Sequence, residues 1–127
     1  MLLLILLALF FVVLQNRINR ICVDELINDY DASAVEADAK YINQRLEISG
    51  KVKSFVKTEG GEVKLLLASV SKYFEINCLL RNKELEAKAT ALTLGTNVTI
   101  FGKCLGLTRE SAEDSIGIIY FESEKIE

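Results

Sequence analysis

The chain has 127 residues, with 15 basic and 18 acidic side chains, a net charge of −3, no histidine and three cysteines. Without histidine, both the usual general base at neutral pH and the commonest metal ligand are missing, and the widely spaced cysteines include no Cys-x-x-Cys pair for zinc. We therefore expect a chain that is not an enzyme, with no catalytic residue, no metal site and no cofactor.

The first predicted element is a hydrophobic helix over residues 1–20. From Leu2 to Leu14 no side chain is polar. A membrane span needs roughly 20 apolar residues and the apolar region of a signal peptide roughly 7–15, but an Ala-x-Ala cleavage site and a basic start are both missing. We favour an uncleaved, single-pass membrane anchor; a cleaved signal and a buried helix are the alternatives. Arg17 and Arg20 follow the apolar run, and the positive-inside rule then places the rest of the chain in the cytoplasm.

Residues 21–44 are predicted to form a helical lead-in that packs on the domain behind it. Asp24 can cap a short helix over Glu25–Tyr30. Ser33 and Glu36 have the spacing of a capping box, which predicts that a second helix begins there. Its inward side is expected to carry the residues that recur at helical spacing, namely Val35, Ala39 and Ile42.

Residues 45–127 read as a domain of short strands. Arg45–Lys57 alternates apolar and polar residues, as a half-buried strand does, and Gly50 in its middle indicates a bend or a bulge. The pair Gly60–Gly61 predicts a hairpin turn into a second strand over Val63–Val70. A third strand over Tyr73–Leu80 follows the turn at Ser71 and Lys72.

A helix separates these strands from two more. Asn82 is positioned to cap a helix from Lys83 to about Leu92, and Gly95 follows its end. The last two strands are predicted over Asn97–Leu105 and Ser115–Glu122. Three strands, a helix and two strands is the order of an OB-fold, a mainly β, five-stranded Greek-key barrel.

Two cysteines fall inside this predicted barrel. By alternation, Cys78 and Cys104 both face inward, where a thiol behaves as a small hydrophobic group. The strands that carry them are not neighbours in an OB-fold, so we expect buried free thiols. Cys22 precedes the barrel, and we assign it no role.

The chain also resembles a particular family. The residues that carry the resemblance are Glu36-Ala-Asp38-Ala-Lys-Tyr41, Leu46-Glu-Ile-Ser-Gly50-Lys-Val52 and Leu94-Gly95-Thr-Asn-Val98-Thr-Ile100-Phe-Gly102-Lys-Cys104. They are similar to the tRNA_anti-like OB-fold family of small bacterial proteins, over about Val23 to Glu122. The resemblance implies an anchored or exported protein, hence a periplasmic alternative to the cytoplasm, and implies nucleic-acid binding by analogy of fold. Family members often end the fifth strand in a cysteine, where this chain has Phe121-Glu-Ser123.

OB-folds bind single strands through aromatic platforms on strands two and three and a basic groove. Alternation places a comparable set outside this barrel, which we take as the candidate ligand face: Lys51, Lys53, Phe55, Lys64, Tyr73, Glu75 and Asn77. Lys57 and Lys72 extend the set. A solvated strand face whose lysines discourage edge-to-edge aggregation accounts for the same pattern.

Charge decides between these interpretations at this point. All 18 acidic residues and 13 of the 15 basic ones follow Arg20, so that part of the chain has a net charge of −5. A nucleic-acid-binding domain usually has a basic patch or a high pI, whereas the pI here is about 5.1. We therefore favour a membrane-tethered, non-catalytic binding module for a protein, peptide or oligosaccharide, with a single-stranded nucleic-acid-binding protein as the alternative. The oligomeric state stays open.

Overall fold

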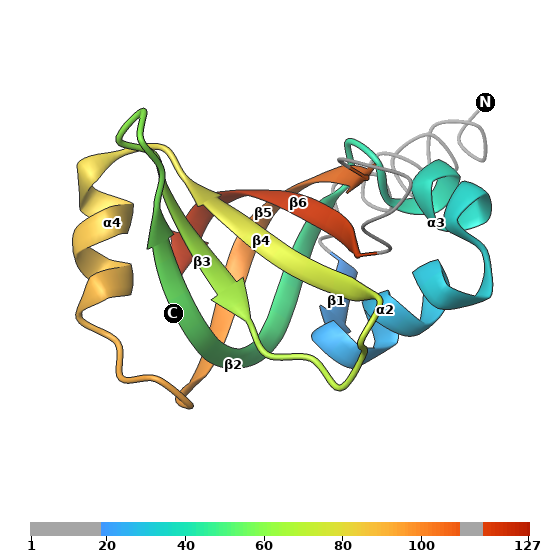
Figure 1. Cartoon of the computed structure of the whole chain (residues 1–127), viewed down its shortest axis with the longest axis horizontal. Helices are drawn as coiled ribbons and strands as arrows, with labels where there is room; N and C mark the ends of the chain where they lie inside the picture. The colour runs from blue at the N-terminus through green and yellow to red at the C-terminus, as the bar shows by residue number, and fades with distance from the viewer. Residues whose placement is uncertain (1–18, 110–115) are drawn as a thin grey trace, which may run out of the picture.

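A computed structural model describes residues 19–109 and 116–127 (Figure 1). Most of the predicted hydrophobic helix, residues 1–18, lies outside this range, and within it no helix is long and apolar enough to cross a bilayer. The elements are β1 (Asn19–Cys22), α2 (Val23–Ala32), α3 (Ala34–Tyr41), β2 (Arg45–Lys57), β3 (Val63–Leu67), β4 (Phe74–Leu80), α4 (Lys83–Thr90), β5 (Asn97–Thr108) and β6 (Gly117–Ile126).

Five of the strands close into a barrel. The strand order is β1-β2-β3-β4-β6-β5, and a further pairing of β2 with β5 closes the circle. The long strand β2 curves through the fold, pairing with β5 over Arg45–Lys51 and with β3 over Val52–Lys57. Strands β4 and β6 are parallel, and the other barrel pairs are antiparallel. The predicted five-stranded Greek-key barrel, with a helix between its third and fourth strands, is confirmed.

The barrel interior is filled by alternate residues of each strand. Leu65, Cys78 and Phe121 form one inward row across β3, β4 and β6, and all three are completely buried. Cys78 and Cys104 are both buried free thiols on strands that are not paired, as predicted. Burial raises the pKa of both thiols, so they behave as core residues.

Strand β1 was not expected. Asn19–Cys22 pairs in parallel with Leu46–Ser49 of β2, and Arg20 Nε lies 2.8 Å from Glu47 Oε2. Asn19 and Arg20 therefore extend the sheet, although they fall at the end of the segment predicted to be a helix. A four-residue strand without clear alternation is below what periodicity can detect.

Gly50 and the bulge are two separate features of β2. The bulge lies between Val52 and Ser54, whereas Gly50 pairs in register with Val98. Gly50 is instead a point of close approach, because a Cβ there would lie 2.6 Å from Cγ2 of Val23, the first residue of α2. The predicted bulge is therefore present in β2 but not at Gly50, whose role is to admit the helix.

The helices cover the two ends of the barrel, with α4 at one end and the pair α2–α3 at the other (Figure 1). Asn82 caps α4 by accepting a hydrogen bond of 2.8 Å from Leu85 N, and Ser33 Oγ accepts one of 3.3 Å from Glu36 N; both predicted caps are confirmed. The predicted cap at Asp24 is wrong, because α2 begins at Val23 and Asp24 lies inside its first turn.

The buried side of α3 also differs from the prediction. Ala37 and Tyr41 are buried, whereas Val35 is 82% exposed and Ala39 and Ile42 are exposed as well. The stripe that contains Tyr41 is buried instead, because the Tyr41 hydroxyl has a polar partner on α2. Tyr41 OH donates to Asp29 of α2, which ties the two helices together.

One carboxylate joins α2, α3 and the barrel. Asp38 Oδ1 accepts hydrogen bonds from Tyr30 OH at 2.8 Å and from Leu107 N at 3.1 Å. Burial raises the pKa of Tyr30 well above its ordinary value, so its hydroxyl remains a donor at any physiological pH. The Asp38 carboxylate is therefore a structural contact.

The close approach at Gly50 predicts a coupled pair of substitutions. Val23 is buried and β-branched, so its side chain has little freedom to move aside. We expect Gly50→Ala to lower the free energy of unfolding by about 1–3 kcal/mol, and Val23→Ala to absorb most of that penalty in the double variant. Denaturation of the full chain in detergent, followed by circular dichroism, measures the cycle. Costs that add to within about 0.5 kcal/mol would show that the two residues do not meet.

The contact at Asp38 predicts a second loss of stability. Asp38→Ala removes the acceptor from the Tyr30 hydroxyl and the Leu107 amide, which costs about 1–3 kcal/mol of unfolding free energy in the same assay. Asp31→Ala, an exposed position at the end of α2, is the matched control and should change stability by less than about 0.5 kcal/mol. Equal effects of the two variants would contradict the assignment.

Candidate ligand face

The barrel has one broad outward surface formed by β3, β4, β6 and the second half of β2. We call it the outer face. In register, Leu66 of β3, Asn77 of β4 and Tyr120 of β6 form its central row. Its members are Lys53, Ser54, Val56, Lys64, Leu66, Glu75, Asn77, Leu79, Ile118, Tyr120 and Glu122.

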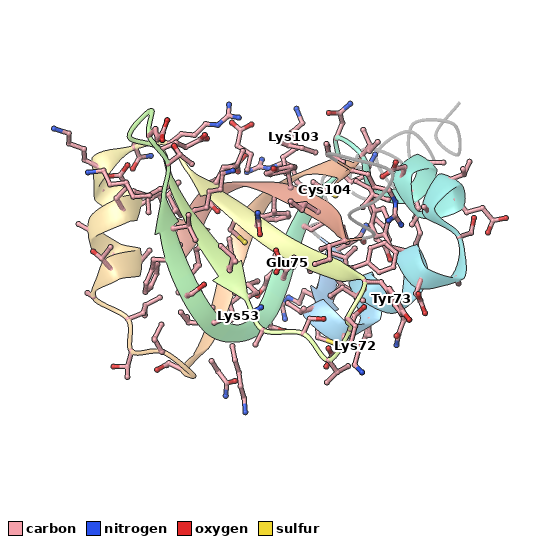
Figure 2. All side chains as sticks on the ribbon, viewed as in Figure 1. Lys53, Lys72, Tyr73, Glu75, Lys103 and Cys104 are labelled. Carbon is pink, nitrogen blue, oxygen red and sulfur yellow. The ribbon has the colours of Figure 1, made fainter. Side chains whose placement is uncertain are left out.

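Four of the seven predicted site residues lie on this face: Lys53, Lys64, Glu75 and Asn77. Figure 2 shows Glu75 on β4, with Lys53 near the bend of β2 and Lys72 and Tyr73 at the β3–β4 connection. Tyr73 is 59% exposed just before β4 begins. Lys51 is exposed but borders a different groove, beside Gly50.

The predicted outward position of Phe55 is wrong. Lys53 is the extra residue of the bulge, so the alternation reverses after it. Phe55 pairs with the buried Leu65 and packs against the core, while Ser54 and Val56 take the outward positions. A bulge cannot be recognised from the alternation of apolar and polar residues alone. Periodicity therefore predicted the wrong orientation for Phe55.

Three contacts set the charge on the outer face. Lys53 Nζ lies 3.6 Å from Glu75 Oε1, and Arg81 Nη1 lies 3.8 Å from Glu122 Oε2 at the far end of β4. Lys64 has a different partner, because its Nζ lies 5.2 Å from the centroid of the Tyr120 ring. The face thus presents a cation stacked on an aromatic ring between two ion pairs.

Tyr120 is the residue that the sequence-based prediction missed. The inward positions of β6 are Gly117, Ile119 and Phe121, so the alternate positions, which include Tyr120, face outward. That alternation is visible in the sequence. The aromatic residues of the predicted ligand face, Phe55 and Tyr73, come from the first and third predicted strands, and the last strand contributes none to it.

Asn77 occupies the centre of the outer face and yet is only 6% exposed. Its Oδ1 is buried without a hydrogen-bond partner, one of two such side-chain atoms in residues 19–109 and 116–127. The other is Ser123 Oγ, on the inward side of β6. The prediction that Asn77 shares a face with Glu75 is correct, but the Asn77 side chain is buried and not exposed to solvent.

The acid excess has a specific location. From Val23 to Tyr41 the sequence contains six acidic residues and one basic residue, which is a net charge of −5. From Arg45 to the end it contains twelve of each. The negative charge therefore belongs to α2 and α3, at one end of the barrel, and the barrel itself is neutral. The whole-domain charge that argued against a phosphate ligand does not describe the outer face.

Two grooves adjoin the barrel. A hollow of about 320 Å³ borders the outer face, and its lining includes Lys53, Ser69, Lys72, Phe74, Glu75 and Ile116. A larger groove of about 600 Å³ lies around Gly50, between the start of α2 and the residues that follow β3, and includes Cys22, Ser49, Lys51, Ser69, Asn97 and Thr99. In the part of the chain that the structure describes, no three acidic or cysteine side chains come together as candidate metal ligands.

A family model, tRNA_anti-like, matches residues 3–112 of the chain. No curated protein matches significantly. Among solved structures, a lipoprotein of Klebsiella pneumoniae assigned to nucleic-acid binding has 14% identity and a TM-score of 0.62, with 85% of this chain and 92% of that chain covered.

Two similar structures are synthetases. A Leishmania major chain assigned as an aspartyl-tRNA synthetase has 17% identity and a TM-score of 0.58, and the asparaginyl-tRNA synthetase of Entamoeba histolytica has 15% and 0.52. Each match covers 87% of this chain but only 20% and 23% of the synthetases. At these identities the similarity shows a shared fold.

Proposed function

The chain belongs to the tRNA_anti-like family, and on that premise we propose that it is a non-catalytic OB-fold module that binds single-stranded nucleic acid on its outer face. The observation that carries the proposal is the stacked pair of Lys64 and Tyr120, beside the apolar side chain of Leu66. Tyr120 is half-buried, and the face of its ring offers a stacking platform for a base of any sequence, at about 1–3 kcal/mol per base. The lysine above it supplies a cation for the adjacent phosphate.

Further cations extend this surface. Lys72 makes no ion pair with any residue described in the structure, and it borders the hollow next to the outer face. Lys53 shares its charge with Glu75, so it contributes less. Two or three lysines along β2, β3 and the β3–β4 connection match the modest basic track that sequence-independent OB-folds combine with aromatic platforms.

The location of the acidic residues removes the main argument for the rival ligands. A protein, peptide or oligosaccharide was favoured because the domain as a whole is acidic, but its excess negative charge lies on α2 and α3. The Klebsiella lipoprotein, which matches along nearly its whole length, is itself assigned to nucleic-acid binding. Both observations support a nucleic-acid ligand over a protein, peptide or oligosaccharide.

The N-terminal segment supports a further proposal, that the residues before β1 tether the domain to a membrane. Its support is the unbroken apolar run from Leu2 to Leu14. A tether ending there would hold the barrel close to the bilayer, because β1 begins at Asn19. Arg17 and Arg20 favour the cytoplasmic side.

Salt-dependent binding tests the ligand. Fluorescence anisotropy of the full chain in a non-ionic detergent, with a labelled 12-nucleotide single strand, should give saturable binding. Two or three phosphate contacts predict a slope of log K against log salt between about −1.4 and −2.1. Lys64→Gln should reduce its magnitude by about 0.7, and Tyr120→Leu should weaken binding about tenfold because stacking is lost.

Lys88→Gln is the matched control for charge, since Lys88 is exposed on α4, at the end of the barrel. It makes the same change in net charge as Lys64→Gln and should leave the salt slope unchanged. Absence of salt-sensitive binding by the unmodified chain, or an equal loss in the two lysine variants, would refute the proposed interface.

Alkaline carbonate extraction tests the tether. The chain should remain in the membrane pellet, and a variant lacking residues 1–16 should move to the supernatant. Protease treatment of spheroplasts then assigns the side: protection of the domain supports the cytoplasm, and digestion supports the periplasm.

A further inference from the structure

We propose that Asn77 accepts a hydrogen bond from an N–H group on the Watson–Crick edge of a base stacked on Tyr120, so that the outer face selects unpaired bases and not phosphate alone. The inference rests on the proposed function, because it assigns a role within the same surface. It starts from the one buried polar atom of that surface that has no partner.

The position of Asn77 makes this atom unusual. It lies in the middle of β4, between Leu66 and Tyr120 in the neighbouring strands. Its outward neighbours on β4 itself are Glu75 and Leu79, of which Leu79 is apolar and buried. Asparagine is depleted in strands, and an apolar side chain would suit a site flanked by leucine and tyrosine. Nothing in the packing of this row requires an amide.

The amide also lowers stability as it stands. A buried acceptor without a donor costs free energy comparable to a lost hydrogen bond, and the carboxamide here is only 6% exposed with Oδ1 unpartnered. Buried polar groups in native proteins nearly always have a partner, so each exception requires a reason. A donor supplied by the ligand is such a reason.

The geometry allows a base to supply that donor. Tyr120 and Asn77 face each other across parallel strands, which lie about 4.8 Å apart. A base stacked on the Tyr120 ring therefore extends its edge over Asn77. Lys64 at present occupies the ring face, and its attraction to a phosphate would draw it aside as the base enters.

The acceptor defines the class of ligand. Adenine, cytosine, guanine, thymine and uracil each carry an N–H on the Watson–Crick edge, whereas an abasic sugar-phosphate strand has none. In a duplex these N–H groups are already paired. Asn77 would therefore favour single strands with exposed bases over both duplexes and bare backbone, without reading one base in particular.

The test separates the amide from the lysines. We expect Asn77→Leu to leave the thermal midpoint unchanged or to raise it, and to weaken binding of a 12-nucleotide single strand by about three- to tenfold. Binding of an abasic strand with the same number of phosphates should not change. Asn77→Val also removes the acceptor and has high strand propensity, and it should show the same selective loss if the leucine variant folds poorly.

Ser123→Ala is the matched control. Ser123 is the other buried polar side chain of the described residues, but it faces the core, where its hydroxyl interacts with the Cys78 thiol. Its removal should leave binding of both strands unchanged.

Two results would overturn the inference. A ratio of base-containing to abasic affinity that is the same in Asn77→Leu, Asn77→Val and the unmodified chain would exclude a base contact and leave the proposed function standing. A marked drop in the thermal midpoint of both Asn77 variants would show that the amide is structural. No binding of either strand by the unmodified chain would instead reject the proposed function itself.

Discussion

The barrel depends on one strand that is shared between two neighbours. Over its first half β2 pairs with β5, and over its second half it pairs with β3, so a single continuous segment closes the circle. That segment must curve sharply, and it does so with a glycine against which α2 packs and a bulge at Lys53. The bulge also reverses which side chains face out, which sends Phe55 to the core and leaves Ser54 and Val56 beside β3.

The helix-covered end of the barrel and its outer face differ in charge. Helices α2 and α3 are held at one end through Asp38, which binds Tyr30 and the backbone of β5, and they carry the excess negative charge. The described helices lie at the two ends of the barrel and not across β3, β4 and β6 (Figure 1). Screening over about 8 Å in physiological salt lets these regions act independently, so the net charge of the chain says little about its ligand.

The sequence was sufficient where a local physical rule applied. Alternation, apolar runs and turn residues together identified all five barrel strands, and alternation identified the inward positions of β5. Hydrogen-bonding side chains identified the caps at Ser33 and Asn82. It failed where the outcome depends on distant contacts. The buried side of α3 depends on the hydrogen bond from Tyr41 to Asp29 of α2. Strand β1 forms because it pairs with the edge of β2. The inward orientation of Phe55 follows from the bulge in β2, which only the pairing with β3 reveals. Tyr120 is the exception, because the alternation of β6 alone places it on the outward side.

A solvated strand face, with lysines that discourage aggregation, explains part of what the outer face contains. It accounts for Lys53 and its ion pair with Glu75, since edge charges need no ligand. It does not account for Asn77, because an anti-aggregation surface gains nothing from an amide that is buried and unpaired at its centre. Proteins keep local defects of this kind where function compensates for the lost stability. The unpaired acceptor, the aromatic ring next to it and the lysine on that ring are together better explained by a surface that is completed when a base binds.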